Sequence, residues 1–150
     1  MIKRVHHTSF TVSDMDRSLR FYRDLLGFEF INEQGGKVPY LSVITGFEEA
    51  DLRVVFLRPT PTSETFLELI QYRWPIGVKA DVRTCNPGSA HICLIVDDIH
   101  AEYERLHAEG VKFRSPPVPI TAGRNKGGFA LYFEDPDGIT LELLQPGPGA

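Results

Sequence analysis

The chain has 150 residues, of which 42% are apolar and 24% are charged, and its net charge is −4 with a pI near 5.7. This length suits one domain or two small modules that share a core, the scattered basic residues argue against a nucleic-acid partner, and no apolar run reaches the roughly 20 residues that span a bilayer. The first residues lack the apolar core of a secretory signal, and Cys85 and Cys93 make no disulfide framework, so we expect a cytoplasmic protein.

An internal repeat organises the chain. The first copy, "HTSFTVSDMDRSLRFYRDLLGFEF", begins at His7, and the second, "HICLIVDDIHAEYERLHAEGVKF", begins at His91. In each copy a strand starts at the histidine, an apolar stripe at helical spacing follows it, and a glycine (Gly27 or Gly110) ends the helix. The repeat therefore predicts the same strand, turn and helix twice.

Aspartates stand where each predicted helix begins. Asp14 or Asp16 in the first copy, and Asp97 or Asp98 in the second, can accept hydrogen bonds from the first backbone N–H groups of the helix. The sequence leaves open which aspartate of each pair is the N-cap.

Three strands are expected after each helix. They are residues 28–33, 53–57 and 66–72 in the first half, and 111–113, 129–134 and 140–144 in the second. Each half then has the order βαβββ, with module one at 3–72, a linker at 73–88 and module two at 89–146. The first half is longer, and we place its additional residues in a loop at 35–50.

A glutamate interrupts the last strand of each half. Glu68 lies within "FLELIQY" and Glu142 within "TLELLQP", each among apolar residues. A buried carboxylate is costly unless it has a partner. Glu68 could lie on a sheet edge or pair with an arginine such as Arg53 or Arg73.

The repeat also relates four potential metal ligands, namely His7, Glu68, His91 and Glu142. Imidazole and carboxylate together suit one divalent ion: Zn, Ni, Co, Mn, Fe or Mg. Two carboxylates with two neutral histidines have a formal charge of −2, which such an ion cancels. We therefore predict a metal site at these four residues, with one or two positions open to substrate.

The segments "HTSFTVSDMDRSLRFYRDLLGFEF", "FLEL", "HICLIVDDI" and "YFEDPDGITLELLQP" resemble the vicinal oxygen chelate superfamily, which includes glyoxalase I, methylmalonyl-CoA epimerase, extradiol dioxygenases and bleomycin-resistance proteins. The resemblance implies an α+β fold in which two tandem βαβββ modules form an incomplete barrel around a metal site. It places His7, Glu68, His91 and Glu142 at the ligand positions, and it implies a homodimer.

The predicted ligand set resembles that of glyoxalase I, whereas methylmalonyl-CoA epimerase commonly has Gln at the position of Glu68. The chain is most similar to glyoxalase I-like and methylmalonyl-CoA epimerase-like members. Extradiol dioxygenases lack an acid at the position of Glu68. Glyoxalase I contacts glutathione through an arginine and an asparagine where this chain has Thr11 and Tyr72. The resemblance therefore narrows the chemistry without naming the substrate.

These ligands indicate an isomerase, epimerase or lyase that moves a proton next to a metal-bound carbonyl. The substrate is a small molecule with a carbonyl or vicinal oxygens, and Glu142 or Glu68 is the candidate general base. A ring-cleaving Fe(II) dioxygenase and a non-catalytic binding or resistance protein of the same fold are the alternatives.

Four residues are candidate substrate-binding groups. Arg124 and Lys126 could meet a carboxylate or phosphate, although a solvated loop explains them equally well. Tyr40 and Phe56 could form an aromatic wall, although core packing explains them equally well. His6 is left out of the metal site, because alternation along a strand turns it away from His7.

Overall fold

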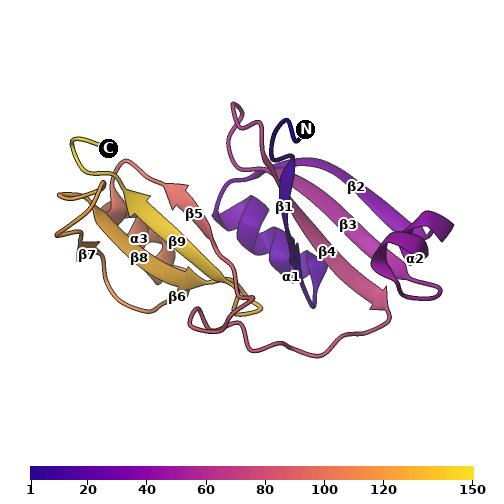
Figure 1. Ribbon diagram of the computed structural model, residues 1–150. Coiled ribbons are helices and arrows are strands. Elements are labelled where there is room, and N and C mark those ends of the chain that lie inside the picture. The colour runs from indigo at the N-terminus through magenta and orange to yellow at the C-terminus, as the bar shows by residue number, and fades with distance from the viewer. The chain divides into compact units, whose positions relative to one another are not determined.

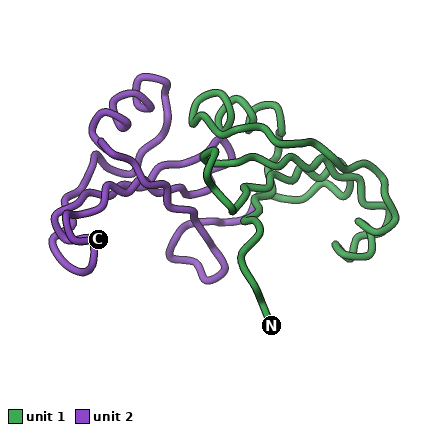
Figure 2. The backbone as a smooth tube through the Cα atoms, turned by 90° about the horizontal axis from the view of Figure 1, so that it is seen from above, with its two compact units in different colours: residues 1–79 green, residues 80–150 purple.

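A computed structural model describes residues 1–150, and the chain forms two compact units, residues 1–79 and 80–150. Figure 2 shows the two units in different colours. Each unit has an open sheet of its own with helices packed beside it (Figure 1). The mixed α+β fold class predicted from the sequence is confirmed, since both units combine a sheet with helices.

The sheet of unit 1 has the strand order β1-β4-β3-β2, with β1 parallel to β4 and the other pairs antiparallel. Its elements are β1 (His7–Thr11), α1 (Met15–Leu19), η1 (Arg20–Leu25), β2 (Glu29–Lys37), α2 (Pro39–Thr45), β3 (Asp51–Arg58) and β4 (Phe66–Trp74). Because β1 and β4 are neighbours, residues 59 positions apart in the chain, such as His7 and Phe66, lie side by side.

Apolar burial holds the first helix against this sheet. Tyr22, Leu67 and Leu69 are almost fully buried. Side chains alternate along β4, so Leu67 and Leu69 point to the helix side while Glu68 points to the opposite face. Burial of the core thus fixes which way Glu68 faces.

The start of each main helix is capped as the repeat predicts, and the structure selects one aspartate of each pair. Asp14 accepts a hydrogen bond from the Arg17 N–H, which lowers the pKa of the Asp14 carboxyl. Asp98 accepts from the N–H groups of His100 and Ala101.

A glutamine in the last strand of each unit also ties the helix to the sheet. Gln71 accepts a hydrogen bond from the Met15 N–H, and Gln145 accepts one from the Ile99 N–H. Each glutamine follows the glutamate of its strand by three positions.

The predicted loop at 35–50 is wrong, because β2 continues to Lys37 and α2 follows it. Glycine usually weakens a strand, yet Gly35 is required here. Its φ is +125°, and a Cβ at this position would lie 2.2 Å from the carbonyl oxygen of Leu52. Close approach of β2 to β3 therefore explains a glycine that looks like a strand end in the sequence.

Unit 2 repeats this plan with shorter strands. Its elements are β5 (Ile92–Ile95), α3 (Ile99–Ala108), β6 (Lys112–Phe113), β7 (Val118–Pro119), β8 (Phe129–Glu134) and β9 (Thr140–Gln145). The strand order is β5-β9-β8-β6, with β7 also paired to β8. The sequence did not predict β7, which is only two residues long.

Burial in unit 2 centres on the sheet and α3. Leu106, Phe133 and Leu141 are fully buried, and the ring of Phe133 stacks on that of Phe113 at 5.7 Å between centroids. None of the helices in either unit has the length and apolar character needed to cross a membrane.

Candidate metal and active site

In unit 1, adjacent parallel strands bring His7 and Glu68 together. Ser9 lies beside Glu68 in the register of β1 and β4, and His7 is two residues before Ser9 on the same face. The Nε2 atom of His7 is 3.4 Å from a carboxylate oxygen of Glu68, and the two side chains are 39% and 14% exposed. The Glu68 side chain is therefore largely buried, and the His7 imidazole is its partner.

Unit 2 repeats this arrangement with His91 and Glu142. Cys93 lies beside Glu142 in the register of β5 and β9, and His91 precedes Cys93 by two residues. The Nε2 atom of His91 is 3.1 Å from a carboxylate oxygen of Glu142, and the side chains are 35% and 20% exposed. The repeat in the sequence is thus also a repeat in geometry.

An aromatic ring lies against the histidine of each pair. Phe56 is cross-strand from Glu68, and its ring meets that of His7 edge-on at 5.6 Å. Tyr132 is cross-strand from Glu142, and its ring lies 5.2 Å from that of His91. The sequence predicted Phe56 as a candidate site residue but did not predict Tyr132. Antiparallel pairing of the predicted strands 129–134 and 140–144 would have placed Tyr132 beside Glu142.

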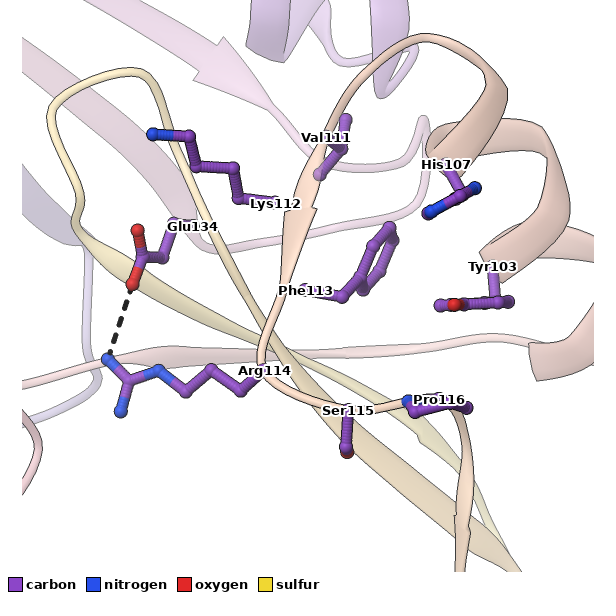
Figure 3. Close-up of a pocket in the computed structure, with 9 residues that line it drawn as sticks. All are labelled: Tyr103, His107, Val111, Lys112, Phe113, Arg114, Ser115, Pro116 and Glu134. Carbon is purple, nitrogen blue, oxygen red and sulfur yellow. Dashed lines mark ion pairs between the residues drawn. The ribbon is translucent and has the colours of Figure 1, made fainter.

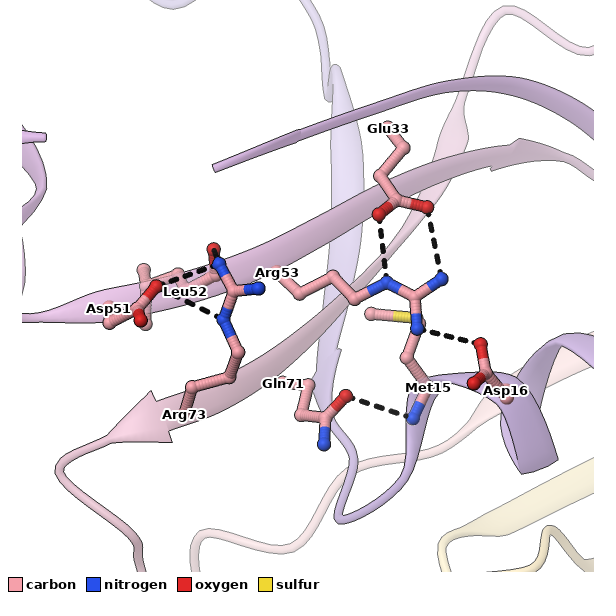
Figure 4. A network of polar contacts seen from close by, with 8 residues as sticks. All are labelled: Met15, Asp16, Glu33, Asp51, Leu52, Arg53, Gln71 and Arg73. Atoms are coloured by element: carbon pink, nitrogen blue, oxygen red, sulfur yellow. Dashed lines mark hydrogen bonds and ion pairs between the residues drawn. The ribbon is translucent and has the colours of Figure 1, made fainter. Parts of the chain in front are cut away.

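The arginine partners considered for Glu68 bind other carboxylates, as Figure 4 shows. Arg53 donates two hydrogen bonds to Glu33, at 2.8 and 3.1 Å, and one to Asp16 at 2.7 Å. Arg73 donates to Asp51. Glu68 therefore pairs with His7 and with neither arginine.

Replacing Arg53 with methionine should lower the free energy of unfolding by about 1 kcal/mol at pH 7, because it removes the ion pairs to Glu33 and Asp16. The loss is small because both carboxylates are exposed to solvent. The hydrogen bonds from Arg53 hold the pKa of Glu33 below its ordinary value of 4.5. A lowered carboxyl pKa stabilises the fold above pH 4.5, and this contribution is lost as the pH falls through the folded-state pKa.

Urea denaturation of the wild type and the Arg53→Met variant between pH 3 and pH 7 measures this difference. The difference in the free energy of unfolding between the two proteins should be largest at neutral pH and should disappear below about pH 4.5. Arg83→Met is the matched control, because Arg83 forms only a local surface pair with Asp81. A gap that does not change with pH would contradict the assignment.

The donor atoms present fit a divalent ion. Two ligand atoms at about 2.1 Å from one ion lie about 3.0 to 3.4 Å apart for angles between about 90° and 109°, and the observed N···O separations are 3.4 and 3.1 Å. The structure contains no group of three or more His, Cys, Asp or Glu side chains placed to hold a metal. It shows one imidazole–carboxylate pair in each unit.

His6 differs from the sequence-based prediction. It precedes β1, so strand alternation does not apply to it, and its Nδ1 atom is 2.8 Å from the Nδ1 atom of His7. One of these nitrogens donates and the other accepts. If the Nε2 lone pair of His7 binds an ion, then Nδ1 of His7 carries the proton and donates a hydrogen bond to Nδ1 of His6.

Cys93 lies next to the carboxylate of Glu142. Partial burial, followed by the negative charge of Glu142 and a hydrogen bond to it, raises the pKa of the Cys93 thiol to about 11. The thiol is therefore neutral at physiological pH.

The four predicted substrate-binding residues lie in different places. Phe56 contacts His7, as described above, whereas Tyr40 is on α2 and 54% exposed. Arg124 and Lys126 are exposed in the unit 2 loop between β7 and β8. Of the two candidates in unit 1, Phe56 is the one that lies beside His7 and Glu68.

A surface cavity of about 570 Å³ lies elsewhere in unit 2, between α3 and β6 (Figure 3). Tyr103, His107 and Phe113 are on one side of it, and Arg114 is paired with Glu134 at 3.7 Å. His91 and Glu142 do not line this cavity. The helix residues His100 and His107 pack against Phe129 and Tyr103.

Comparison with known families gives a direct match. Residues 4–143 match the profile of the Glyoxalase/Bleomycin resistance protein/Dioxygenase superfamily. The chain belongs to this superfamily. Members of this glyoxalase superfamily typically use a divalent metal ion.

Relatives with established names span most of the chain. A 2-epi-5-epi-valiolone epimerase from Actinomyces sp is 31% identical over 97% of this chain and 81% of its own length. A lactoylglutathione lyase from Haemophilus influenzae is 30% identical over 95% of this chain and 92% of its own length. A probable chloroplastic lactoylglutathione lyase from Arabidopsis thaliana is longer, and the chain spans 37% of it.

A solved structure shares the fold of this superfamily member. The crystal structure of a glyoxalase family protein from Bacillus cereus has a TM-score of 0.80 and covers 98% of this chain and 96% of its own. Its sequence identity is 18%, so the likeness concerns the fold alone.

Proposed function

We propose that this superfamily member is a glyoxalase-like lyase or isomerase that transfers a proton next to a carbonyl group, with one divalent ion as cofactor. The recurrence of the His–Glu pair in both units is the main support, since packing of a core needs no such pair. Relatives named as a lyase and as an epimerase also support it.

The proposed ligands are the Nε2 atoms of His7 and His91 and the carboxylates of Glu68 and Glu142. When bound, a divalent ion supplies Lewis-acid stabilisation of the negative charge that develops on the carbonyl oxygen. Both glutamates are only partly exposed, so a substrate beside them would displace little water. In this proposal both carboxylates act on one reacting carbon.

In this proposal the two carboxylates accept and donate the transferred proton. Glu142 or Glu68 takes the α-proton and becomes a carboxylic acid, and the electron pair of the broken C–H bond moves into the enolate. For an α-hydroxy ketone, return of the proton to the neighbouring carbonyl carbon, together with transfer of the hydroxyl proton to the former carbonyl oxygen, isomerises the substrate. If the other glutamate delivers a proton to the opposite face, the product is the epimer. The same two proposed carboxylates thus account for either outcome.

The test is α-proton exchange in D2O. We expect protein loaded with Ni, Co, Mn, Zn, Mg or Fe to deuterate the α-carbon of at least one α-hydroxy ketone, acyl-CoA thioester or glutathione hemithioacetal, as followed by NMR. Chelator-treated protein should lose this exchange, and the same metal should restore it.

Other outcomes identify other functions. Absence of metal-dependent exchange with all three substrate classes would refute the proposal. Oxygen uptake with catechols would instead indicate the Fe(II) dioxygenase, and tight binding of a small molecule by protein that takes up no metal would indicate a binding protein. Glu104, which is exposed on α3, provides a matched control variant, Glu104→Gln.

A further inference from the structure

The sheet face of unit 1 that holds His7 and Glu68, here called the His7 face, continues along β3 and β4 as an apolar surface. Phe56 is cross-strand from Glu68, and Ile70 and Tyr72 follow Glu68 on the same side of β4. All three side chains are partly exposed. An apolar strip therefore starts beside the carboxylate and runs along the strand.

The segment that distinguishes unit 1 from unit 2 packs onto this strip. Leu41 of α2 forms a buried cluster with Leu52 and Val54, and Val38, Phe56, Ile70 and Tyr72 pack against it. The ring of Phe47, just after α2, meets the ring of Tyr72 edge-on at 5.9 Å. Residues 38–47 thus wall one end of the His7 face.

The side chains that pack together at this walled end carry no charge. The residues that form it are Val38, Leu41, Phe47, Phe56, Ile70 and Tyr72. The nearby arginines Arg53 and Arg73 are paired with acidic groups (Figure 4). An anionic group placed here would lose water without gaining a counter-charge, whereas an apolar group would gain contacts.

We infer that the walled end of the His7 face binds an apolar or aromatic substituent of the carbonyl substrate and that Tyr72 helps select it. This inference rests on the proposed function and adds the class of substrate. Strand rise places Ile70 about 7 Å and Tyr72 about 13 Å from Glu68. A phenyl ring or a hexyl chain on a carbonyl beside Glu68 is long enough to reach Ile70 and to approach the Tyr72 side chain, while a methyl group is not.

A series of α-hydroxy ketones tests the inference on the metal-loaded, full-length protein. The series is hydroxyacetone, its hexyl and phenyl homologues, and a homologue whose chain ends in a carboxylate. We expect kcat/KM for α-deuteration to be at least about tenfold higher for the hexyl or phenyl compound than for hydroxyacetone. The carboxylate-ended compound should lose that advantage.

The Tyr72→Ser variant should reduce the phenyl-to-methyl ratio of kcat/KM to less than about threefold. Because the ratio is measured within one protein preparation, partial unfolding does not change it. Val118→Ser is the control, since Val118 is exposed on β7 of unit 2, and it should leave the ratio unchanged.

Ligand binding gives a readout that needs no turnover. Addition of the phenyl compound should shift the NMR signals of the Ile70 and Leu41 methyl groups, with a dissociation constant at least about tenfold below that of hydroxyacetone. Equal affinity for the two compounds, or no shift at these methyl groups, would overturn the inference. If all ketones of the series exchange with equal kcat/KM, the inference fails and the proposed function stands. If the phenyl compound binds but none of the ketones exchanges, the proposed function alone is contradicted.

Discussion

The Glu142→Gln variant should lose at least about a hundredfold in the rate of α-proton exchange, because general acid–base catalysis by a positioned carboxylate contributes about 10² to 10⁴. Glutamine keeps the size of the side chain, but it cannot take a proton and is a poorer ligand. Glu142 is paired with His91 and 20% exposed. The measurement is single-turnover deuteration at saturating metal, with metal content determined for each sample.

Glu68→Gln should have an effect of the same order, because both carboxylates are proposed to act on one carbon. The double variant then tests whether they share a site. For one site we expect it to be no more than about tenfold slower than the slower single variant, since residues that act as a unit are strongly non-additive. Two losses that multiply would show that the glutamates act separately.

Metal stoichiometry provides a second view of the same question. Titration calorimetry should give one divalent ion per chain, and either glutamine variant should bind that ion more weakly, because each removes one negative charge from the ligand set. Glu104→Gln should match the wild type in both assays, because Glu104 lies on the exposed side of α3. Two ions per chain would contradict a shared site.

The largest expected effect on stability is that of Phe133→Ala, which should lower the free energy of unfolding by about 3 to 5 kcal/mol. Phe133 is fully buried on β8 and stacks on Phe113. Truncation to alanine removes this contact and leaves a cavity that a sheet paired on both sides of β8 cannot easily close. Urea denaturation monitored by circular dichroism measures the change.

Phe133→Leu provides the graded comparison, with an expected cost of about 1 kcal/mol, because leucine fills most of the space. Val118→Ala should change the stability by less than about 0.5 kcal/mol, since Val118 is 50% exposed. A cost below 1 kcal/mol for Phe133→Ala would mean that the packing around β8 is looser than the structure shows.

The proposed site and the buried core of unit 1 lie on opposite faces of the same strand. On β4, Leu67 and Leu69 face the helix, and Glu68 faces the other side with Ile70 and Tyr72. A change on one face need not disturb the other, which explains how members of one superfamily can keep the fold while differing in substrate. Residues 38–47 add apolar side chains to the His7 face, and unit 2 has no helix that corresponds to α2.

Much of this architecture follows from short-range patterns in the sequence. Alternation and helical spacing predicted both main helices and eight strands, and the repeat located the histidine and glutamate of each pair. Strands and helices are recognisable because their periods are local. The same locality explains two errors: Gly35 looked like a strand end, and α2 looked like part of a loop.

The sequence by itself determined that the chain is a duplicated α+β unit of this superfamily and that each half has one histidine and one glutamate of interest. Only the tertiary structure decided that Glu68 pairs with His7 while Arg53 and Arg73 bind other acids, that an aromatic ring lies against each histidine, and that α2 walls one end of the His7 face. These partners lie tens of residues apart in the chain, and strand pairing brings them together. Patterns within a few residues cannot specify contacts of that kind.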